Sequence, residues 1–517
     1  MTNPDRSMEQ NFQQNSQQTS AAKPSIKKAI IIGTGFAGLG MAIALKKHNI
    51  HDFVILEKQH DVGGVWRENT YPGAACDVPS HLYSFSFYLN PNWSRTFAPQ
   101  AEIYAYLQDC AQRYQLLQHI NFGAEVSAAS YNESEQIWQV RLKDGQVLHS
   151  QMLITAMGQL SQPAFPNIEG RESFTGPSFH SAQWDHSIDL SDKRVAVIGT
   201  GASAIQFVPA IAQRVKSLSV FQRTPAYIMP RPDGANSGLK KRLFGQFPIL
   251  MKLQRLAYYT QYESRAIAFT RFKGLMKFAV GIPFRRLLTS QLADPILRQK
   301  MTPDYQIGCK RILLSSNYFE AFNRPNVQLV TDNITRITPS GVQTTDGKTH
   351  DVDLLIYGTG FAATEFLAPL TITGVGGIDL NAAWVDGAKA YLGITVPKFP
   401  NFFMLYGPNT NLGHNSIVFM IESQIAHVMR CIKKMEQANA SVIEVQPNEY
   451  ESFAATVQKN LAHTVWTGCQ SWYIDGRGYN STNWPGFTVS YRWITKRRSL
   501  EAYRLSSSSE TTLRGAA

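Results

Sequence analysis

Two stretches of the chain share one pattern of apolar residues and glycines. In residues 27–58, an isoleucine-rich run ends in a glycine-rich turn, an apolar helical stretch follows, and a second apolar run ends at Glu57. Residues 193–224 repeat this order, and their second run leads into Arg223. Short β-branched runs bounded by glycine predict buried strands, and the longer stretches between them predict helices. Each stretch is therefore predicted to be a strand–turn–helix–strand unit.

The glycine turns are typical of dinucleotide binding. Glycines let the backbone approach a pyrophosphate, and the N-terminus of the next helix offers free N–H groups and a positive dipole end. One such turn could be an ordinary strand-to-helix turn, but two in the same context favour nucleotide sites. The first turn contains Gly33, Gly35, Phe36 and Gly38, and the second contains Gly199, Gly201, Ser203 and Ala204.

The charge at the end of the second strand distinguishes the two units. Glu57 and Arg223 each follow the first glycine of their turn by 24 positions. A carboxylate accepts hydrogen bonds from ribose hydroxyls, whereas a guanidinium pairs with a 2′-phosphate. The first unit is therefore expected to bind FAD and the second NADPH. Arg223 could alternatively be a solvated charge at a strand end.

Two further strand–glycine segments, at 152–158 and 354–361, indicate where the chain crosses between two nucleotide domains. The expected fold is α/β, with two Rossmann-like dinucleotide-binding domains and a helical insertion. The expected parts are an FAD-binding domain at 26–160 and 361–505, an NADPH-binding domain at 166–235 and 308–358, the insertion at 236–307, and disordered polar tails at 1–25 and 506–517.

Composition narrows the class of protein. None of the apolar runs among the 517 residues approaches the ~20 residues of a membrane span, and the N-terminus lacks the apolar region of a secretory signal. The five cysteines are scattered without CxxC spacing. That spacing argues against a redox dithiol, a zinc or other metal site and a disulfide framework. A cytoplasmic location is therefore expected.

The positive charge is concentrated in one segment. Residues 240–300 hold thirteen Lys and Arg against Glu263 and Asp294, while the rest of the chain is close to neutral. A nucleic-acid role is therefore not indicated. Basic segments with interspersed Leu, Phe, Met and Tyr predict either peripheral contact with an anionic membrane or a helical domain with inward apolar faces and solvated charges. The oligomeric state stays open.

A motif before the second glycine turn resembles a known family. Residues 174–185 match the pattern FxGxxxHxxxW followed by Asp, which is the fingerprint of flavin-dependent Baeyer–Villiger monooxygenases. The related nitrogen- and sulfur-oxygenating flavin enzymes usually have Phe or Tyr in place of the Trp. The segments 63–87, 221–225, 308–327 and 357–361 also resemble that family. The fingerprint residues are Phe174, Gly176, His180, Trp184 and Asp185.

The resemblance implies an activity. NADPH would reduce FAD, and the resulting flavin peroxide would attack a ketone, giving an ester or lactone and water. By similarity, Arg311 would stabilise the anionic oxygen species, Asp77 would orient Arg311, and Lys310 would join Arg223 and Thr224 at the 2′-phosphate. His180 and Trp184 would couple NADPH binding to domain movement. The residues matching FAD contacts are Gly64, Trp66, Asp77, Tyr83, Val126 and Gln159.

Other interpretations stay open. Asp77 could be a helix N-cap, Arg311 a surface charge, and Trp66 and Tyr83 core residues. The chain could also oxygenate nitrogen or sulfur, or be a non-catalytic flavin sensor. It departs from the family at Ala75, where an Arg is common, and at residues 471–487, in the part of the chain that commonly closes over substrate.

Overall fold

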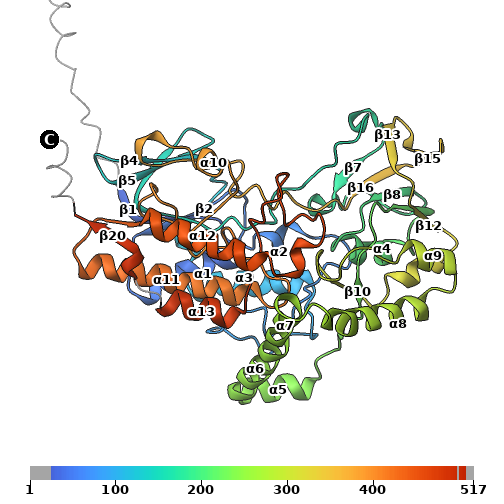
Figure 1. The fold of residues 1–517 in the computed structure, drawn as a ribbon, viewed down its shortest axis with the longest axis horizontal. Coiled ribbons are helices and arrows are strands. Elements are labelled where there is room, and N and C mark those ends of the chain that lie inside the picture. The colour runs from blue at the N-terminus through green and yellow to red at the C-terminus, as the bar shows by residue number, and fades with distance from the viewer. Residues whose placement is uncertain (1–24, 498–499, 508–517) are drawn as a thin grey trace, which may run out of the picture.

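Two sheets, one on each side of the molecule, organise the chain (Figure 1). The computed structural model describes residues 25–497 and 500–507. The tails expected at 1–25 and 506–517 lie almost entirely outside these residues. Ser506, expected in the second tail, instead ends strand β20.

The first sheet is built around the first predicted unit. Its strand order is β17-β4-β5-β6-β1-β2-β3, and β18 also pairs with β6. β1 is a central strand because it pairs in parallel with β2 and β6, and its consecutive residues Ile30, Ile31 and Ile32 are all buried. The strands are β1 (Ile26–Ile32), β2 (Phe53–Glu57), β3 (Ile120–Phe122), β4 (Val126–Asn132), β5 (Ile137–Leu142), β6 (Val147–Thr155), β17 (Thr371–Thr373) and β18 (Phe402–Met404).

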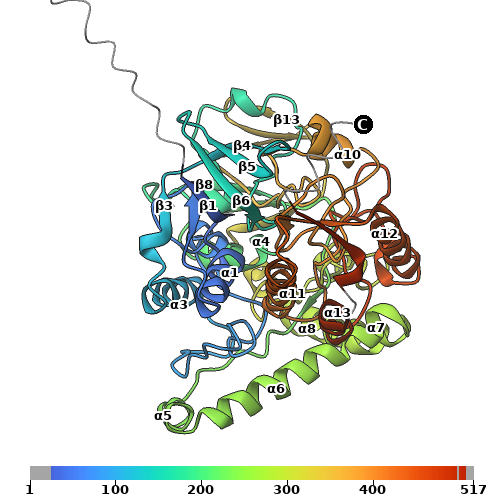
Figure 2. The ribbon, with the colours of Figure 1, turned by 90° about the vertical axis from the view of Figure 1, so that its left-hand side faces the viewer.

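Helix α1 (Phe36–Lys47) follows the first glycine turn and is buried along almost its whole length. A helix that is apolar all round needs cover on every side. The first sheet and helix α11 (Ile417–Gln437) supply that cover (Figure 2). The approach is close, since a Cβ atom at Gly40 would lie 2.9 Å from Ile425 Cδ1. The other helices on this side are α2 (Val65–Glu68), α3 (Gln100–Arg113), α10 (Leu380–Ala383), α12 (Pro447–Leu461) and α13 (Thr488–Arg497).

The second sheet contains the second predicted unit. Its parallel strands run in the order β12-β9-β8-β16-β7, and α4 (Ala204–Ile211) follows the glycine turn. Side chains of β8 alternate between two cores, with Val195 and Val197 in one and Ala196 and Ile198 in the other. The strands are β7 (Ser178–His180), β8 (Arg194–Ile198), β9 (Ser217–Phe221), β12 (Val327–Val330) and β16 (Leu354–Tyr357). The predicted α/β class is therefore confirmed.

The two sheets are joined by two neighbouring connections. The chain leaves the first sheet after β6 and returns to it after β16. The Ala164 N–H donates to the carbonyl of Gly360 at 2.9 Å, and the Ala362 N–H donates to the carbonyl of Gln162 at 3.0 Å. The crossing segments therefore lie side by side.

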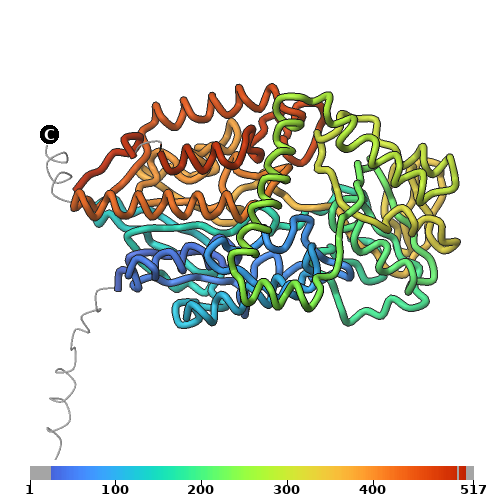
Figure 3. Tube along the Cα trace, turned by 90° about the horizontal axis from the view of Figure 1, so that it is seen from below, coloured from blue at the N-terminus to red at the C-terminus, as the bar shows by residue number. Residues whose placement is uncertain are grey.

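Residues 238–291 form a set of helices along one edge of the molecule, the lower edge in Figures 1 and 2, and α9 follows them. Seen from below, the trace of α5 and α6 crosses in front of the rest of the chain (Figure 3). None of the helices in the described ranges is long and apolar enough to cross a membrane. The helices are α5 (Gly238–Gln246), α6 (Pro248–Ser264), α7 (Ala266–Thr270), the π-helical turn η4 (Lys277–Gly281), α8 (Ile282–Gln291) and α9 (Pro295–Lys300).

Three small sheets complete the fold. They pair β10 with β11, β13 with β14 and β15, and β19 with β20. Their bounds are β10 (Ile228–Met229), β11 (Leu313–Leu314), β13 (Ile334–Thr338), β14 (Gly341–Thr344), β15 (Thr349–Asp351), β19 (Val442–Val445) and β20 (Tyr503–Ser506).

One expectation about the cysteines is wrong. Cys309 and Cys469, which are 160 positions apart, form a disulfide. The argument against disulfides rested on local spacing, and local spacing does not report which distant segments the fold brings together. Cys76, Cys110 and Cys431 are free and buried.

Candidate functional site

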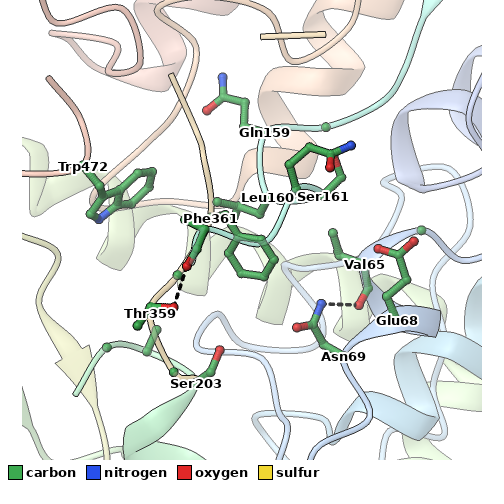
Figure 4. A pocket seen from close by; sticks show the side chains of 18 of the residues that line it. Val65, Glu68, Asn69, Gln159, Leu160, Ser161, Ser203, Thr359, Phe361 and Trp472 are labelled. Atoms are coloured by element: carbon green, nitrogen blue, oxygen red, sulfur yellow. Dashed lines mark hydrogen bonds between the residues drawn. The ribbon is translucent and has the colours of Figure 1, made fainter. Parts of the chain in front are cut away.

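A cavity of about 1190 Å³ lies between the two sheets. Its walls come from both glycine turns, both crossing segments, the loop after β9 and the segment around Arg311. The loop that contains Trp472, called the C-terminal loop below, completes them. Figure 4 shows Asn69 on one wall, Trp472 on another, and Phe361 of the second crossing between them. The cavity is therefore placed to hold ligands that contact both units.

The first glycine turn is shaped for close backbone approach. Gly33 has a φ of 102°, and a Cβ atom there would lie 2.8 Å from the carbonyl oxygen of Ala156. A Cβ atom at Gly38 would lie 1.9 Å from the carbonyl oxygen of Gly33, so α1 presses directly on the turn. At Gly35, by contrast, a Cβ atom would meet only the Cα atom of Gly64, at 3.9 Å. The open space beside Gly35 and the uncapped N-terminus of α1 fit a diphosphate.

Glu57 ends β2 at the edge of this turn and is buried. Its Oε2 accepts hydrogen bonds from the backbone and hydroxyl of Thr34, and its Oε1 accepts from the N–H of Gln59 at 3.0 Å. Arg67 Nη1 lies 3.4 Å from the same Oε1. The carboxylate is held in place at the cavity wall, where it fits the predicted ribose contact.

The second glycine turn has the same shape with one difference. Gly199 has a φ of 105°, and a Cβ atom there would lie 2.5 Å from the carbonyl oxygen of Gly358. A Cβ atom at Gly201 would meet nothing closer than 3.8 Å. Ala204 stands where the first unit has its third glycine, and its methyl group packs toward Gly358. The turn again leaves room for a diphosphate at the N-terminus of α4.

Two cations stand beside this turn. Arg223 and Lys310 line the cavity, and neither has a carboxylate within ion-pair distance in the described part of the chain. Burial, together with the charge of Arg223, lowers the pKa of Lys310. Two neighbouring cations that lack an ion-pair partner repel each other, so their arrangement fits a multiply charged anion.

Arg311 and Asp77 meet on the cavity wall. Arg311 Nη2 donates a hydrogen bond to Asp77 Oδ2, and this ion pair joins the segment after α9 to the loop between α2 and α3. The Asp77 carboxylate raises the pKa of the Arg311 guanidinium, so Arg311 stays charged. Burial raises the pKa of Tyr473, another neighbour of Arg311, to about 12, and its phenol therefore stays protonated. Arg311 is thus a fixed positive charge facing the cavity.

Gln159 leaves one polar atom unpaired. Its Nε2 donates to the carbonyls of Tyr406 and Gly407 at 3.2 and 3.3 Å, which fixes the side chain. Its Oε1 is buried and has no hydrogen-bond partner among the described residues. An unpaired buried acceptor in the cavity wall fits an N–H donor of a flavin ring.

Trp66 and Tyr83 form one aromatic wall. Trp66 Nε1 donates to the Tyr83 hydroxyl at 3.2 Å, and the two rings pack edge to face. Both residues line the cavity. Their exposure to the cavity favours the predicted flavin contact over a purely core position.

The fingerprint residues lie outside the cavity lining. His180 ends β7 and packs its ring against Phe165 of the first crossing and Phe361 of the second, with centroids 5.5 and 5.7 Å away. Trp184 packs against Phe207 of α4. His180 therefore contacts both connections between the sheets, and neither His180 nor Trp184 lines the cavity.

The structure brings most of the predicted site residues together. Of the predicted catalytic and cofactor residues, Gly38 and Ala204 do not line the cavity; each lies behind its glycine turn. The residues that line it are Gly33, Gly35, Phe36, Glu57, Gly64, Trp66, Asp77, Tyr83, Val126, Gln159, Gly199, Gly201, Ser203, Arg223, Thr224, Lys310 and Arg311.

Sequence reasoning missed several contributors. Gln206 of α4 reaches across to the first unit, where its amide bonds the backbone of Ala75 and the hydroxyl of Tyr71. Tyr406 and Trp472 line the cavity from the C-terminal half of the chain. Both residues lie in or next to segments rich in glycine, asparagine and aromatic residues, and such a composition indicates functional loops. It does not show that these loops line the cavity.

Comparison with known proteins agrees with this geometry. Residues 30–233 match the family model described as pyridine nucleotide-disulphide oxidoreductase. A Baeyer-Villiger monooxygenase of Pseudomonas aeruginosa is 45% identical over 92% of this chain and 91% of its own length. One from Streptomyces coelicolor is 42% identical over 92% of each chain.

Solved structures extend the likeness to the whole fold. The closed crystal structure of cyclohexanone monooxygenase is 27% identical, with a TM-score of 0.85, over 94% of this chain and all of the other. The oxidized steroid monooxygenase bound to NADP is 30% identical, with a TM-score of 0.83, over 93% of this chain and all of the other.

Proposed function

Because this chain belongs to the Baeyer–Villiger monooxygenases, we propose that it inserts one oxygen atom of O₂ next to a ketone carbonyl. The reaction consumes the ketone, O₂, NADPH and a proton, and yields an ester or lactone, NADP⁺ and water. It is an FAD- and NADPH-dependent reaction. The substrate partner is a ketone small molecule.

The Arg311–Asp77 pair is the observation that supports this proposal best. When bound, FAD and NADPH supply the hydride transfer and oxygen activation. The oxygenation step develops negative charge on oxygen, first on the attacking oxygen and then on the former carbonyl oxygen. A guanidinium that is permanently charged and held by a carboxylate stabilises that charge without having to reorganise. Arg311 is positioned for this role, and Asp77 for fixing its approach.

The remaining site residues are proposed to bind and orient the cofactors. The Gly33 and Gly199 turns hold the two diphosphates, and Glu57 accepts from a ribose. Arg223 and Lys310, with Thr224 beside them, hold the 2′-phosphate. The unpaired Oε1 of Gln159 would accept a hydrogen bond from the flavin ring.

Part of the cavity wall is apolar and favours an apolar substrate. Leu412, Ile417 and Ile421 line the cavity, and Trp472 covers one side of it. Apolar walls with a few polar groups are usual for small-molecule sites. The ketone therefore carries its apolar part toward Leu412 and its carbonyl toward Arg311.

A panel of ketones tests the function. NADPH oxidation, O₂ uptake and product formation are measured for each ketone, with a sulfide and a tertiary amine in the same panel. Ester formed in step with NADPH oxidation supports the proposal. Oxygenation of only the sulfide or amine would assign the chain to nitrogen or sulfur oxygenation, and absence of NADPH-driven O₂ uptake would assign it to non-catalytic flavin binding.

We also propose where the enzyme acts. NADPH is regenerated inside the cell, so the cytoplasmic compartment expected from the sequence is kept, although the disulfide weakens the cysteine argument for it. Within that compartment, residues 240–300 are proposed to contact membrane surfaces peripherally.

A further inference from the structure

The helices of the insertion expose large apolar side chains to solvent. Leu239, Ile249, Phe272 and Phe278 each expose between 59% and 69% of their surface. The outward-facing side chains of residues 239–282 are called the insertion surface below. Scattered single apolar residues are normal on protein surfaces, whereas a concentration of them marks a binding surface.

The orientation of α6 is fixed from its inner side. Arg255 donates hydrogen bonds to the carbonyls of His81, Leu82 and Ser84 at 2.8 to 3.1 Å. Met251 and Tyr262, on the same side of the helix, are buried. A helix anchored along this side cannot rotate to bury its opposite side.

The opposite side of α6 is apolar. Ile249, Leu253 and Leu256 follow one another at intervals of four and three residues, which places them on one face of the helix. Each exposes more than half of its surface. The expectation that the apolar faces of this segment pack inward is therefore wrong for α6, because this helix has apolar residues on both sides and the fold covers only one.

The charges around this face are almost all positive. Residues 240–300 contain thirteen Lys and Arg and only two acids. Glu263 is buried, where it accepts hydrogen bonds from Asn415, Thr488 and the backbone of Val489. Asp294 caps α9. Exposed cations such as Lys252 and Lys277 therefore stand among exposed Leu, Ile and Phe, and neither forms an ion pair in the described part of the chain.

We propose that the insertion surface docks on an anionic lipid bilayer. The apolar side chains would enter the interfacial region, and the Lys and Arg side chains would meet the lipid phosphates. The cores of protein interfaces are depleted in Lys, so a mixture of exposed Lys with apolar residues fits a lipid surface better than a protein partner.

The docking surface adjoins the candidate site. The turn that exposes Leu275 and Phe278 buries Met276, and a Cβ atom at Gly308 would lie 2.5 Å from Met276 Cε. Gly308 begins the segment that carries Lys310 and Arg311. Docking would therefore bring the cavity close to the bilayer, where an apolar ketone dissolves. This last step rests on the proposed function, whereas the docking itself does not.

Vesicle co-sedimentation of the FAD-loaded full chain tests the docking. Vesicles of phosphatidylcholine alone are compared with vesicles that also contain phosphatidylglycerol, at low and at high salt. We expect binding to the anionic vesicles at low salt and weaker binding at high salt. The double variant Leu253→Ser/Phe278→Ser should bind these vesicles roughly tenfold more weakly than the wild type. The variant Lys252→Glu should bind them at least about fivefold more weakly.

Val385→Ser is the matched control. Val385 is similarly exposed but follows α10, at the opposite edge of the molecule from α6 in Figures 1 and 2. The Val385→Ser variant should bind vesicles like the wild type. All of these variants should oxidise a water-soluble ketone at the wild-type rate, so that a failure of docking can be told apart from a failure of the activity. No binding to anionic vesicles at low salt overturns the proposal. Self-association through this surface, detected by sedimentation velocity and abolished by the double variant, also overturns it and assigns the surface to a second copy.

Discussion

Arg311 and Asp77, which are 234 positions apart in the sequence, form an ion pair on the wall of the cavity between the two sheets. Asp77 comes from the loop between α2 and α3, and Arg311 follows the helices of the insertion. The pair therefore fixes a positive charge at the boundary between the two nucleotide units, where the chemistry of both must meet.

Replacing Arg311 should separate reduction from oxygenation. Arg311→Ala keeps both glycine turns, so it should bind FAD and oxidise NADPH. Losing one preorganised charged donor to a developing oxyanion should lower ester formation by about 10²–10³-fold. Consumed oxygen should then be released as H₂O₂. Product chromatography, NADPH absorbance and an H₂O₂ assay measure each step.

The control for this variant is Arg324→Ala, since Arg324 is exposed and lies outside the cavity lining. It should couple NADPH oxidation to ester formation like the wild type. If Arg311→Ala does so as well, Arg311 is not the stabilising charge.

Asp77 should act through Arg311. Asp77→Asn keeps the shape of the side chain but removes its negative charge, so the ion pair becomes a hydrogen bond from the charged guanidinium to a neutral amide oxygen, a loss of about 1–1.5 kcal/mol. Ester formation should therefore fall by roughly tenfold, less than for Arg311→Ala. The double variant should be no worse than Arg311→Ala alone, because both changes remove one interaction. Additive losses, measured as coupling ratios in a double-mutant cycle, would give Asp77 an independent role.

Coenzyme preference should depend on Arg223 and Lys310. Arg223→Ala and Lys310→Ala each remove a charge-assisted hydrogen bond to a 2′-phosphate, so each variant should bind NADPH roughly 10–100-fold more weakly. NADH lacks that phosphate and should bind nearly as before. The pKa of Lys310 is lowered, so Lys310 loses its charge as the pH rises through that pKa. The affinity for NADP⁺ should then weaken, whereas the affinity for NAD⁺ should not. Titration calorimetry across pH checks both, and equal losses for the two coenzymes would contradict the assignment.

Buried histidines should make the fold sensitive to acid. Burial lowers the pKa of His81, His180 and His427 to about 4 from an ordinary value of 6.5. The unfolded chain takes up these protons near pH 6.5 and the folded chain does not, so the free energy of unfolding falls as pH falls from 6.5 toward 4. Each of these imidazoles lowers the free energy of unfolding by up to about 1.4 kcal/mol for every pH unit in this range.

Urea unfolding at several pH values measures this dependence. His427→Gln should reduce the slope between pH 6.5 and 4. A slope that is the same in His427→Gln as in the wild type would show that this imidazole titrates alike in both states.

Local patterns in the sequence predicted the parts of this fold that local geometry determines. The turns at Gly33 and Gly199 and the strands beside them follow from glycine spacing and β-branched runs, so they were found without any knowledge of tertiary contacts. The Arg311–Asp77 contact was expected only through the family resemblance, because no local pattern links residues so far apart.

Tertiary packing decided the rest. Periodicity identified an amphipathic insertion, but it could not show that Arg255 anchors α6 by one side and leaves Leu253 outside. Nor could it show that His180 packs against both crossings rather than facing the cavity. These outcomes depend on which surfaces pack against each other in the folded protein, and local sequence patterns do not determine that packing.

The disulfide between Cys309 and Cys469 should support the site. It ties the segment that carries Arg311 to the loop that carries Trp472 and Tyr473. A cross-link of this kind contributes about 2–4 kcal/mol to the free energy of unfolding, mainly by restricting the unfolded chain. Cys469→Ser should therefore lower the Tm, and a looser C-terminal loop should lower the ester formed per NADPH. Reducing agent should produce the same changes in the wild type and none in the variant. Thiol titration of the denatured, unreduced protein should find three free thiols out of five cysteines, and a count of five would show that Cys309 and Cys469 are not joined.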